Sequence, residues 1–158
     1  MAVTFDASTK AGSNKKQTST NANITIDAGA NHIVIEIGIL GTTTVSTVDI
    51  GGTGAALIVG ANNGTNNRAE LWSLHNPPTG TITVTVTLAA SAKHSWVAAS
   101  FNNTLASTPE GSNASNTGNN TAPTVTITPR TSDSMFAGGM ILQSPGLTIT
   151  QGASQTSI

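Results

Sequence analysis

The sequence predicts an all-β fold, an antiparallel β-sandwich of the jelly-roll kind, and three observations carry that prediction. Residues 81–88 alternate strictly between threonine and aliphatic residues. Side chains alternate between the two faces of a strand, so one face of this segment meets a core and the other meets water. Similar short segments recur along the chain between turn-forming residues, and no segment keeps the 3.6-residue period of an amphipathic helix. Together these patterns are typical of a sandwich or barrel.

The other strands are expected at short, regular intervals. Clusters of Gly, Asn, Pro and Ser, such as residues 27–31 and 62–64, separate them and supply turns at low conformational cost. Pro123 and Pro129 bracket one expected strand, which is where prolines are tolerated. The expected strands cover residues 2–6, 22–27, 31–40, 43–50, 55–59, 68–75, 80–88, 93–102, 123–128, 134–142 and 146–150.

Residues 33–40 form the expected centre of the fold. Four alternating isoleucines, from Ile33 to Ile39, occupy one face, while the other face is mainly apolar and carries one acid, Glu36. A strand that is apolar on both faces is typical of a central, covered position. We therefore expect one face in the core and the other beneath a loop, a second layer or a partner subunit.

Two stretches are too polar to pack a core of their own. Residues 102–122 are rich in Asn, Ser, Thr and Gly, and are expected to form a long polar loop that is either mobile or ordered by a neighbour. Residues 11–20 are similar and are expected to form an arm. The predicted organisation is an N-terminal strand and flexible arm over residues 1–20, followed by a single sandwich domain over residues 21–158.

Composition limits the classes of function. The chain has 158 residues, of which 37% are hydrophobic and 3% aromatic, enough for one domain with a modest core that favours help from neighbouring subunits. Six basic and seven acidic residues give a net charge of −1, and the basic residues are scattered, so nucleic-acid binding is not expected. The absence of cysteine excludes a disulfide framework and thiolate metal sites.

Targeting and membrane segments are not expected either. Residues 1–16 contain no apolar stretch of the kind that a signal peptide needs, so we expect synthesis and folding in the cytoplasm. No apolar run approaches the roughly 20 residues of a transmembrane helix. The chain is therefore expected to make no membrane contact.

The histidines His32, His75 and His94 are the first candidates for chemistry. A catalytic triad would need a nucleophile and an oriented carboxylate beside one of them, and no GxSxG elbow or comparable motif accompanies the serines. No pair has the short spacing of a local metal motif, so a metal site would require the fold to gather them. We expect ordinary strand-end residues, with no catalytic residue, no cofactor site and no metal site.

The acidic residues are widely separated, and the aromatic residues that stack on sugars are nearly missing, so a glycosidase is not expected. Glu36 lies within an apolar strand, where burial would demand a partner such as Arg68, Lys93 or a backbone donor. We expect instead that the face carrying Glu36 is open to solvent. The acids are Asp6, Asp27, Glu36, Asp49, Glu70, Glu110 and Asp133.

Trp72 and Trp96 each lie within an expected strand. Tryptophan in such a place usually fills a core while its Nε1 donates to a carbonyl, and we expect that role here. N-x-[ST] sequons also occur, and without a secretory leader they are interpreted as accidental in an Asn- and Thr-rich chain. They begin at Asn23, Asn63, Asn102, Asn113 and Asn119.

Residues 68–101 resemble a module of uncharacterised all-β proteins. A first strand ends in a turn of the form leu-x-x-pro-x-x-gly, Leu74–Gly80, which leads into the Thr/Val strand 81–88 and then into a small-residue strand that ends in Ser-Phe, Ser95–Phe101. Members of this family occur in phage and prophage structural proteins, including tail, fibre and head accessories, and in some bacterial surface proteins. The resemblance covers roughly residues 31–150. It implies a jelly-roll-like sandwich and no catalytic residue.

The chain departs from this family at its C-terminal end. The family pattern usually continues with one or two more strands around and after residues 146–158, often with a tryptophan and a closing Ala/Val strand, whereas here the sequence stops at Ile158. Missing strands would leave a sheet edge or a core slot open to another chain. We therefore expect a strand or arm from a neighbouring subunit to complete the sandwich.

These observations lead to one functional hypothesis and two alternatives. The leading hypothesis is a non-enzymatic virion structural protein of a bacterial virus, a capsid decoration or head-fibre accessory whose partners are copies of itself, the major capsid protein or another virion protein. The first alternative is a receptor- or glycan-binding module of a tail fibre or adhesin, with contacts made by residues 61–67 and 102–122. The second is a strand-donating extracellular filament subunit whose leader was removed.

Overall fold

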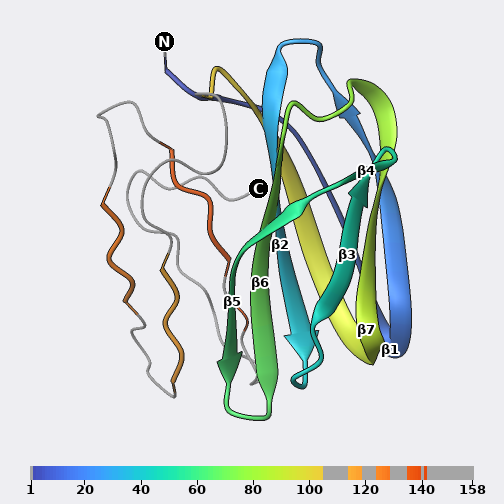
Figure 1. Ribbon diagram of the computed structural model, residues 1–158, viewed down its shortest axis with the longest axis vertical. Coiled ribbons are helices and arrows are strands. Elements are labelled where there is room, and N and C mark those ends of the chain that lie inside the picture. The colour runs from blue at the N-terminus through green and yellow to red at the C-terminus, as the bar shows by residue number, and fades with distance from the viewer. Residues whose placement is uncertain (1, 105–113, 119–123, 129–134, 140, 142–158) are drawn as a thin grey trace.

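The computed structural model describes residues 2–104, 114–118, 124–128, 135–139 and 141, and it is an all-β structure without helices in those residues (Figure 1). Its strands pair antiparallel throughout. The predicted all-β class is confirmed. The strands are β1 (Thr4–Ile26), β2 (Ala30–Leu40), β3 (Val45–Ile50), β4 (Thr53–Gly54), β5 (Ala56–Asn63), β6 (Asn67–His75) and β7 (Gly80–Asn102).

One long strand, β7, organises the molecule. β1 pairs with it along one side, while β3 pairs with its first half and β2 with its second half on the other side. The resulting order is β4-β3-β7-β2-β6-β5, with β1 beside β7. The sheet curls into a nearly closed, barrel-like sandwich whose layers are β1-β7-β3-β4 and β1-β7-β2-β6-β5 (Figure 1). This strand order does not make the molecule a clear jelly roll.

The two strands expected at 80–88 and 93–102 are parts of the single strand β7. Residues 89–92 contain neither Gly nor Pro, so nothing in them ends a strand. They pass from one layer to the other, and Ala89 N donates to Thr44 O at 2.9 Å, which keeps the neighbouring chain attached at the bend. A long curved strand therefore takes the place of the expected turn.

The expected arm over residues 11–20 is also wrong, because these residues belong to β1. The pairing is regular on both sides of the bend, with Ala11 opposite Trp96 and Thr20 opposite Val86. Register shifts between Ser13, Gln17 and Ser19 accommodate the curvature of the sheet. A polar composition did not prevent a strand here, since β7 supplies hydrogen-bond partners whatever the side chains are.

The core lies between the two layers and is built from alternating aliphatic residues. Val84 and Val86 are fully buried, whereas the threonines between them face outward, as the alternation predicts. Both tryptophans belong to this core, which confirms their predicted placement. Its members with exposures of 3% or less are Ile24, Ile26, Ile33, Ile35, Ile37, Ile39, Val48, Ile50, Val84, Val86, Leu88, Trp96 and Ala98.

The outer face of β2 is covered as well. Gly139 lies against the Glu36 carboxylate so closely that it leaves no room for a side chain, and a Cβ on Gly38 would lie 2.9 Å from Ile141 Cγ1. In Figure 1 the described C-terminal segments run beside this layer, on the side away from β3 and β1. β2 is thus central and covered on both faces, as predicted.

The other C-terminal expectations have mixed outcomes. Residues 124–128 and 135–139, expected to lie in strands, have no strand assignment. Asn102, placed at the start of the expected loop 102–122, is the last residue of β7, and residues 114–118 have no regular structure. The expected strand 146–150 and residues 105–113 and 119–122 of that loop lie outside the described residues, as do Pro123 and Pro129.

Candidate functional site

The structure brings two of the three histidines together. His32 on β2 lies opposite His75 on β6, with ring centroids 5.8 Å apart and the planes inclined at 59°. His94 lies opposite Ile39, seven residues along β7 from the residue paired with His32, which is roughly 20 Å. A site built from all three is therefore excluded by this geometry.

The surroundings of His32 favour the neutral form of its ring. Burial, and then the charge of the neighbouring His75, lower the pKa of His32 below its ordinary value of 6.5. The Nδ1 atom of His75 is buried and has no hydrogen-bond partner. His32 therefore resists protonation in the folded state, so its neutral ring contributes stability above pH 6.5, and this stability is lost as the pH falls through the lowered pKa of His32.

Replacing His75 with glutamine is expected to raise the pKa of His32 toward 6.5, because the substitution removes the neighbouring positive charge but leaves His32 buried. The measurement is an NMR titration of the His32 ring in both proteins. The decline of stability below pH 6.5 should be shallower in the variant. An unchanged His32 titration would show that burial alone controls this ring.

His94 belongs to a second group, with Thr20 and Trp96. Ala92 O can only accept, so His94 Nδ1 donates to it at 3.1 Å, and in the neutral ring Nε2 accepts from the Thr20 hydroxyl at 2.8 Å. Trp96 Nε1 donates to the same hydroxyl oxygen at 2.9 Å. The arrangement includes a hydroxyl beside an imidazole, but a carbonyl rather than a carboxylate orients the ring, and His94 is buried in the core. We interpret it as a structural link from β1 to β7.

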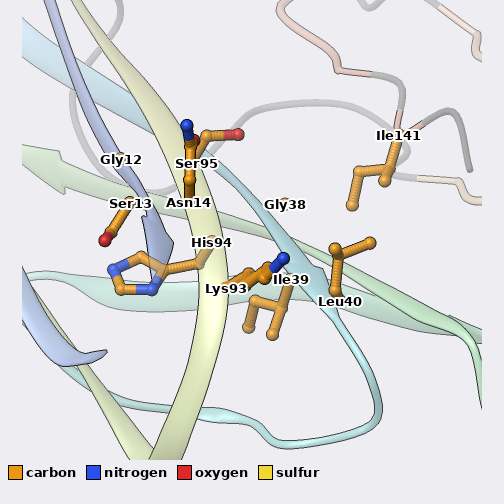
Figure 2. Close-up of a pocket in the computed structure, with 10 residues that line it drawn as sticks. All are labelled: Gly12, Ser13, Asn14, Gly38, Ile39, Leu40, Lys93, His94, Ser95 and Ile141. Atoms are coloured by element: carbon orange, nitrogen blue, oxygen red, sulfur yellow. The ribbon is translucent and has the colours of Figure 1, made fainter. Parts of the chain in front are cut away.

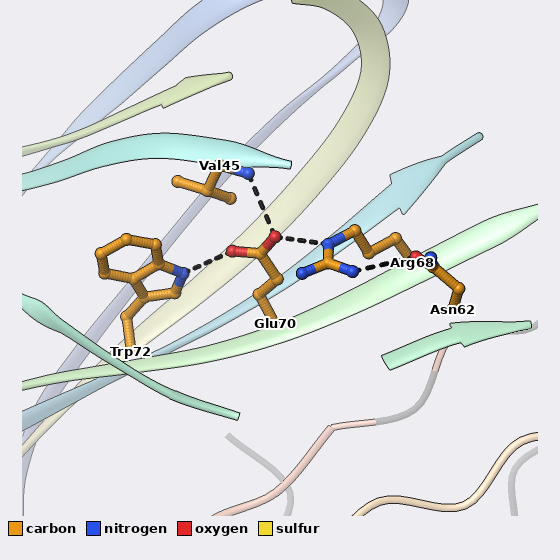
Figure 3. A network of polar contacts seen from close by, with 5 residues as sticks. All are labelled: Val45, Asn62, Arg68, Glu70 and Trp72. Atoms are coloured by element: carbon orange, nitrogen blue, oxygen red, sulfur yellow. Dashed lines mark hydrogen bonds and ion pairs between the residues drawn. The ribbon is translucent and has the colours of Figure 1, made fainter. Parts of the chain in front are cut away.

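Glu70 is the centre of the most highly connected polar network (Figure 3). Its side chain is completely buried, and Oε1 accepts from Arg68 Nε and from the Val45 backbone N–H at 3.1 Å. Oε2 accepts from Trp72 Nε1 at 2.8 Å. Arg68 Nη1 in turn donates to Asn62 Oδ1 at 3.0 Å. Three donors satisfy this buried carboxylate, so it joins β6 to the first residue of β3.

A second buried link holds the two ends of the β1–β7 ladder together. The Ser100 hydroxyl, fully buried, donates to Asp6 Oδ2 at 2.7 Å and accepts from Ala7 N–H at 3.2 Å. Asp6 Oδ2 also accepts from Asp27 N–H at 3.2 Å. These bonds lie at the register shift between Phe5 and Ser8, where the regular ladder is interrupted. Side chains thus replace the backbone pairing that the shift removes.

The solvent-open environment expected for Glu36 is wrong. Its carboxylate is partly buried beneath Gly139, and neither Arg68 nor Lys93 pairs with it. Desolvation raises the pKa of Glu36 from 4.5 to about 6. Arg68, proposed as a partner, binds Glu70 on the opposite face of the sheet instead.

Replacing Glu36 with glutamine is expected to remove a pH dependence of stability. The protonated carboxyl is favoured in the folded state, so its contribution is full below pH 4.5 and is lost as the pH rises through about 6. Between those values the wild type should lose about 1–2 kcal/mol relative to the variant. Urea unfolding of both proteins across this pH range provides the measurement, and parallel curves would contradict the expectation.

A shallow depression of about 470 Å³ lies where β1, β2 and β7 meet (Figure 2). Gly12, Leu40 and Ile141 contribute to its lining, and among the described lining residues Lys93 and His94 carry the titratable side chains. The His94 imidazole is already bonded to Thr20 and Ala92. Ser13, Asn14 and Ser95 add polar side chains to the described part of the lining, which contains no carboxylate beside the His94 ring.

Comparison with known proteins gives no assignment, since no protein-family model, no curated protein and no solved structure matches the chain. Among the described residues, no group of three or more His, Cys, Asp or Glu side chains could hold a metal ion. No helix in that part of the chain is long and apolar enough to cross a membrane.

The core placement of both tryptophans agrees with the prediction from the sequence, but their hydrogen-bond partners differ from it. Both were expected to donate to backbone carbonyls, whereas Trp72 donates to Glu70 and Trp96 to Thr20. One signal was present for the first network, because Arg68, Glu70 and Trp72 occupy alternate positions and must share a strand face. Thr20 gave no such signal, since its distance from Trp96 depends on how β1 pairs with β7.

Proposed function

We propose that the chain is a non-enzymatic structural protein of a bacterial virus particle, a capsid decoration or head-fibre accessory that acts through contacts between subunits. The observation that carries this proposal is the use made of buried polar groups. Glu70, Ser100 and His94 all hold strands together rather than converging on a shared open cavity. Buried polar groups that connect strands in this way favour a protein that acts through its shape and its surface contacts.

The family resemblance supports the same proposal. Its motif falls on the framework of the molecule, because the Leu74–Gly80 turn joins β6 to β7 and Ser95–Phe101 forms the second half of β7. The proposed jelly-roll character of the sandwich depends on this resemblance too. Only 8% of the residues in the chain are charged, and a weakly charged surface suits broad, hydrogen-bonded contacts with copies of the chain or with a capsid protein.

The direct test is association with particles. A tagged copy of the chain, expressed in cells that produce the virus, is expected to co-sediment with purified particles in many copies, and electron microscopy should place it on their surface. A protein that stays in the soluble fraction while intact particles form would contradict the proposal.

A receptor- or glycan-binding module of a tail fibre or adhesin is the second candidate. The specific observation in its favour is the β5–β6 turn, where Asn62, Thr65 and Asn66 are exposed together. The turn is tighter than the expected loop 61–67, since β5 extends to Asn63 and β6 begins at Asn67. Binding to a glycan array that is lost when Asn62 and Asn66 are replaced with alanine would favour this candidate. A strand-donating filament subunit would instead polymerise in solution.

A further inference from the structure

Within the described residues, three strands of the curled sheet have one side without a strand partner. β4 and β5 end the strand order there, and β1 pairs with β7 and with no other described strand. An unpaired strand edge presents backbone N–H and C=O groups that another chain can extend, so natural proteins usually protect such edges. The three edges differ in how they are protected.

Most of these edges carry recognised protection. β4 has only two residues, and β5 has a register shift between Leu57 and Val59. The first half of β1 has a shift between Phe5 and Ser8 and a charge at Lys10. Further shifts interrupt its middle, where Lys15 and Lys16 lie. Short length, bulges and lysines are the devices that discourage edge-to-edge pairing.

The second half of β1, residues 19–26, has none of these devices. It forms eight consecutive register pairs with β7, from Ser19–Thr87 to Ile26–Gly80, without a shift. It contains no charged residue, no proline and no glycine. In Figure 1 this part of the sheet lies on the opposite side of the molecule from the described C-terminal segments. It is therefore a straight, neutral edge about 27 Å long.

Several side chains of this edge already have partners, on both faces. Ile24 and Ile26 are buried in the core. On the outer face Asn23 Oδ1 accepts from the Thr83 hydroxyl at 2.9 Å, and Thr25 and Thr81 share a bond of 2.9 Å. The backbone N–H and C=O groups that point away from β7 are therefore the groups that a partner strand can bind. A partner needs a matching neutral strand with one apolar and one amide- or hydroxyl-bearing face.

We propose that residues 19–26 pair antiparallel with the same residues of a second copy of this chain, which joins the β1-β7-β3 layers of two subunits into one sheet. The segment meets the requirement for its own partner, because its copy is equally neutral and brings no like charges into opposition. A twofold axis makes such an interface self-complementary. This inference rests on the proposed function and names the surface through which subunits meet.

The alternation of the strand restricts the register. Residues directly opposite each other share a face, so Ile24 and Ile26 must meet residues of the core-side set, and a one-residue slip is not allowed. One register that satisfies this condition places the two copies of Asn23 opposite each other. Ile24 then lies opposite Ala22 of the second copy, and Asn21 opposite Thr25.

The test uses charge at Asn23, which is exposed. Asn23→Lys and Asn23→Glu are each expected to weaken dimerisation by about tenfold or more, because like charges meet across the axis. An equimolar mixture of the two variants should dimerise again. Asn23→Ala loses the same bond to Thr83 without adding charge and should remain dimeric, as should Thr47→Lys on the outer face of β3. Sedimentation equilibrium up to about 100 µM gives the readout, with tryptophan fluorescence as the check on folding.

The outcomes separate this inference from the proposed function. A wild type that is monomeric over the whole range, or a folded Asn23→Lys variant that dimerises like the wild type, overturns the pairing. If the monomeric wild type still joins particles and Asn23→Lys does not, the edge binds a different protein and the proposed function stands. If the dimer forms as expected but never joins particles, the pairing stands and the proposed function fails.

Discussion

Replacing Glu70 with alanine is expected to lower the free energy of unfolding by about 3–5 kcal/mol. The substitution leaves the Val45 N–H and Trp72 Nε1–H without their acceptor and the Arg68 guanidinium without its counter-charge, all at a side chain that is fully buried. Groups deprived of a partner in this way keep their desolvation penalty. Urea unfolding followed by tryptophan fluorescence measures the loss.

Two other variants serve as controls for the effect of Glu70→Ala on the free energy of unfolding. Glu70→Gln keeps one acceptor oxygen and the shape of the side chain, so its loss should be smaller, about 1–3 kcal/mol. Asp27→Asn changes an exposed carboxylate and should cost within about 0.5 kcal/mol. If Glu70→Ala cost no more than Asp27→Asn, the network would not hold β6 to β3 as described.

Replacing Ile35 with alanine is expected to cost about 2–5 kcal/mol, since it opens a cavity at a fully buried position in the middle of β2. The neighbouring Val34→Ala, on the outer face of the same strand, is the matched control. Val34 is only partly buried, so we expect a smaller loss of about 0.5–1.5 kcal/mol. Urea unfolding again provides the measurement.

The sizes of these two losses test the arrangement of layers. A loss at Val34 as large as that at Ile35 would mean that the outer cover of β2 packs as tightly as the core. A loss at Ile35 below that at Val34 would mean that the two faces of the strand have been exchanged, which contradicts the fold. Glu36 shares the outer face of β2 with Val34. Its carboxyl is protonated at low pH, so measuring the loss of unfolding free energy for each variant at low and at neutral pH also reports on Glu36.

Much of the fold could be predicted because strand alternation is a local property. Val84, Val86 and Leu88 fall on the core face, as their spacing with Thr83, Thr85 and Thr87 requires. The central position of β2 followed in the same way from its two apolar faces. What could not be predicted was strand continuity, since whether residues 11–20 and 89–92 extend a strand depends on the partner that lies beside them.

The environments of the polar residues were harder to predict for a related reason. Glu70 and Glu36 occur in similar apolar stretches, yet Glu70 is bound by three donors, whereas Glu36 is covered by Gly139 and pairs with no cation among the described residues. The donors of Glu70 include Val45, which is 25 residues away in the sequence. Hydrophobic patterning records which face a residue occupies but not which long-range neighbour meets it there.

Residue patterning alone predicts the all-β class, the core positions of the alternating aliphatic residues and tryptophans, and the central place of residues 33–40. These features follow from the burial of apolar side chains, which is favourable whichever apolar neighbours they meet. Three features depend on long-range pairing and are visible in the folded molecule alone: β1 and β7 run unbroken between layers, Thr20 contacts His94 and Trp96, and residues 19–26 form a neutral edge. The physical reason is that hydrogen bonds and ion pairs are directional and require particular partners, and the fold brings those partners together from distant parts of the chain.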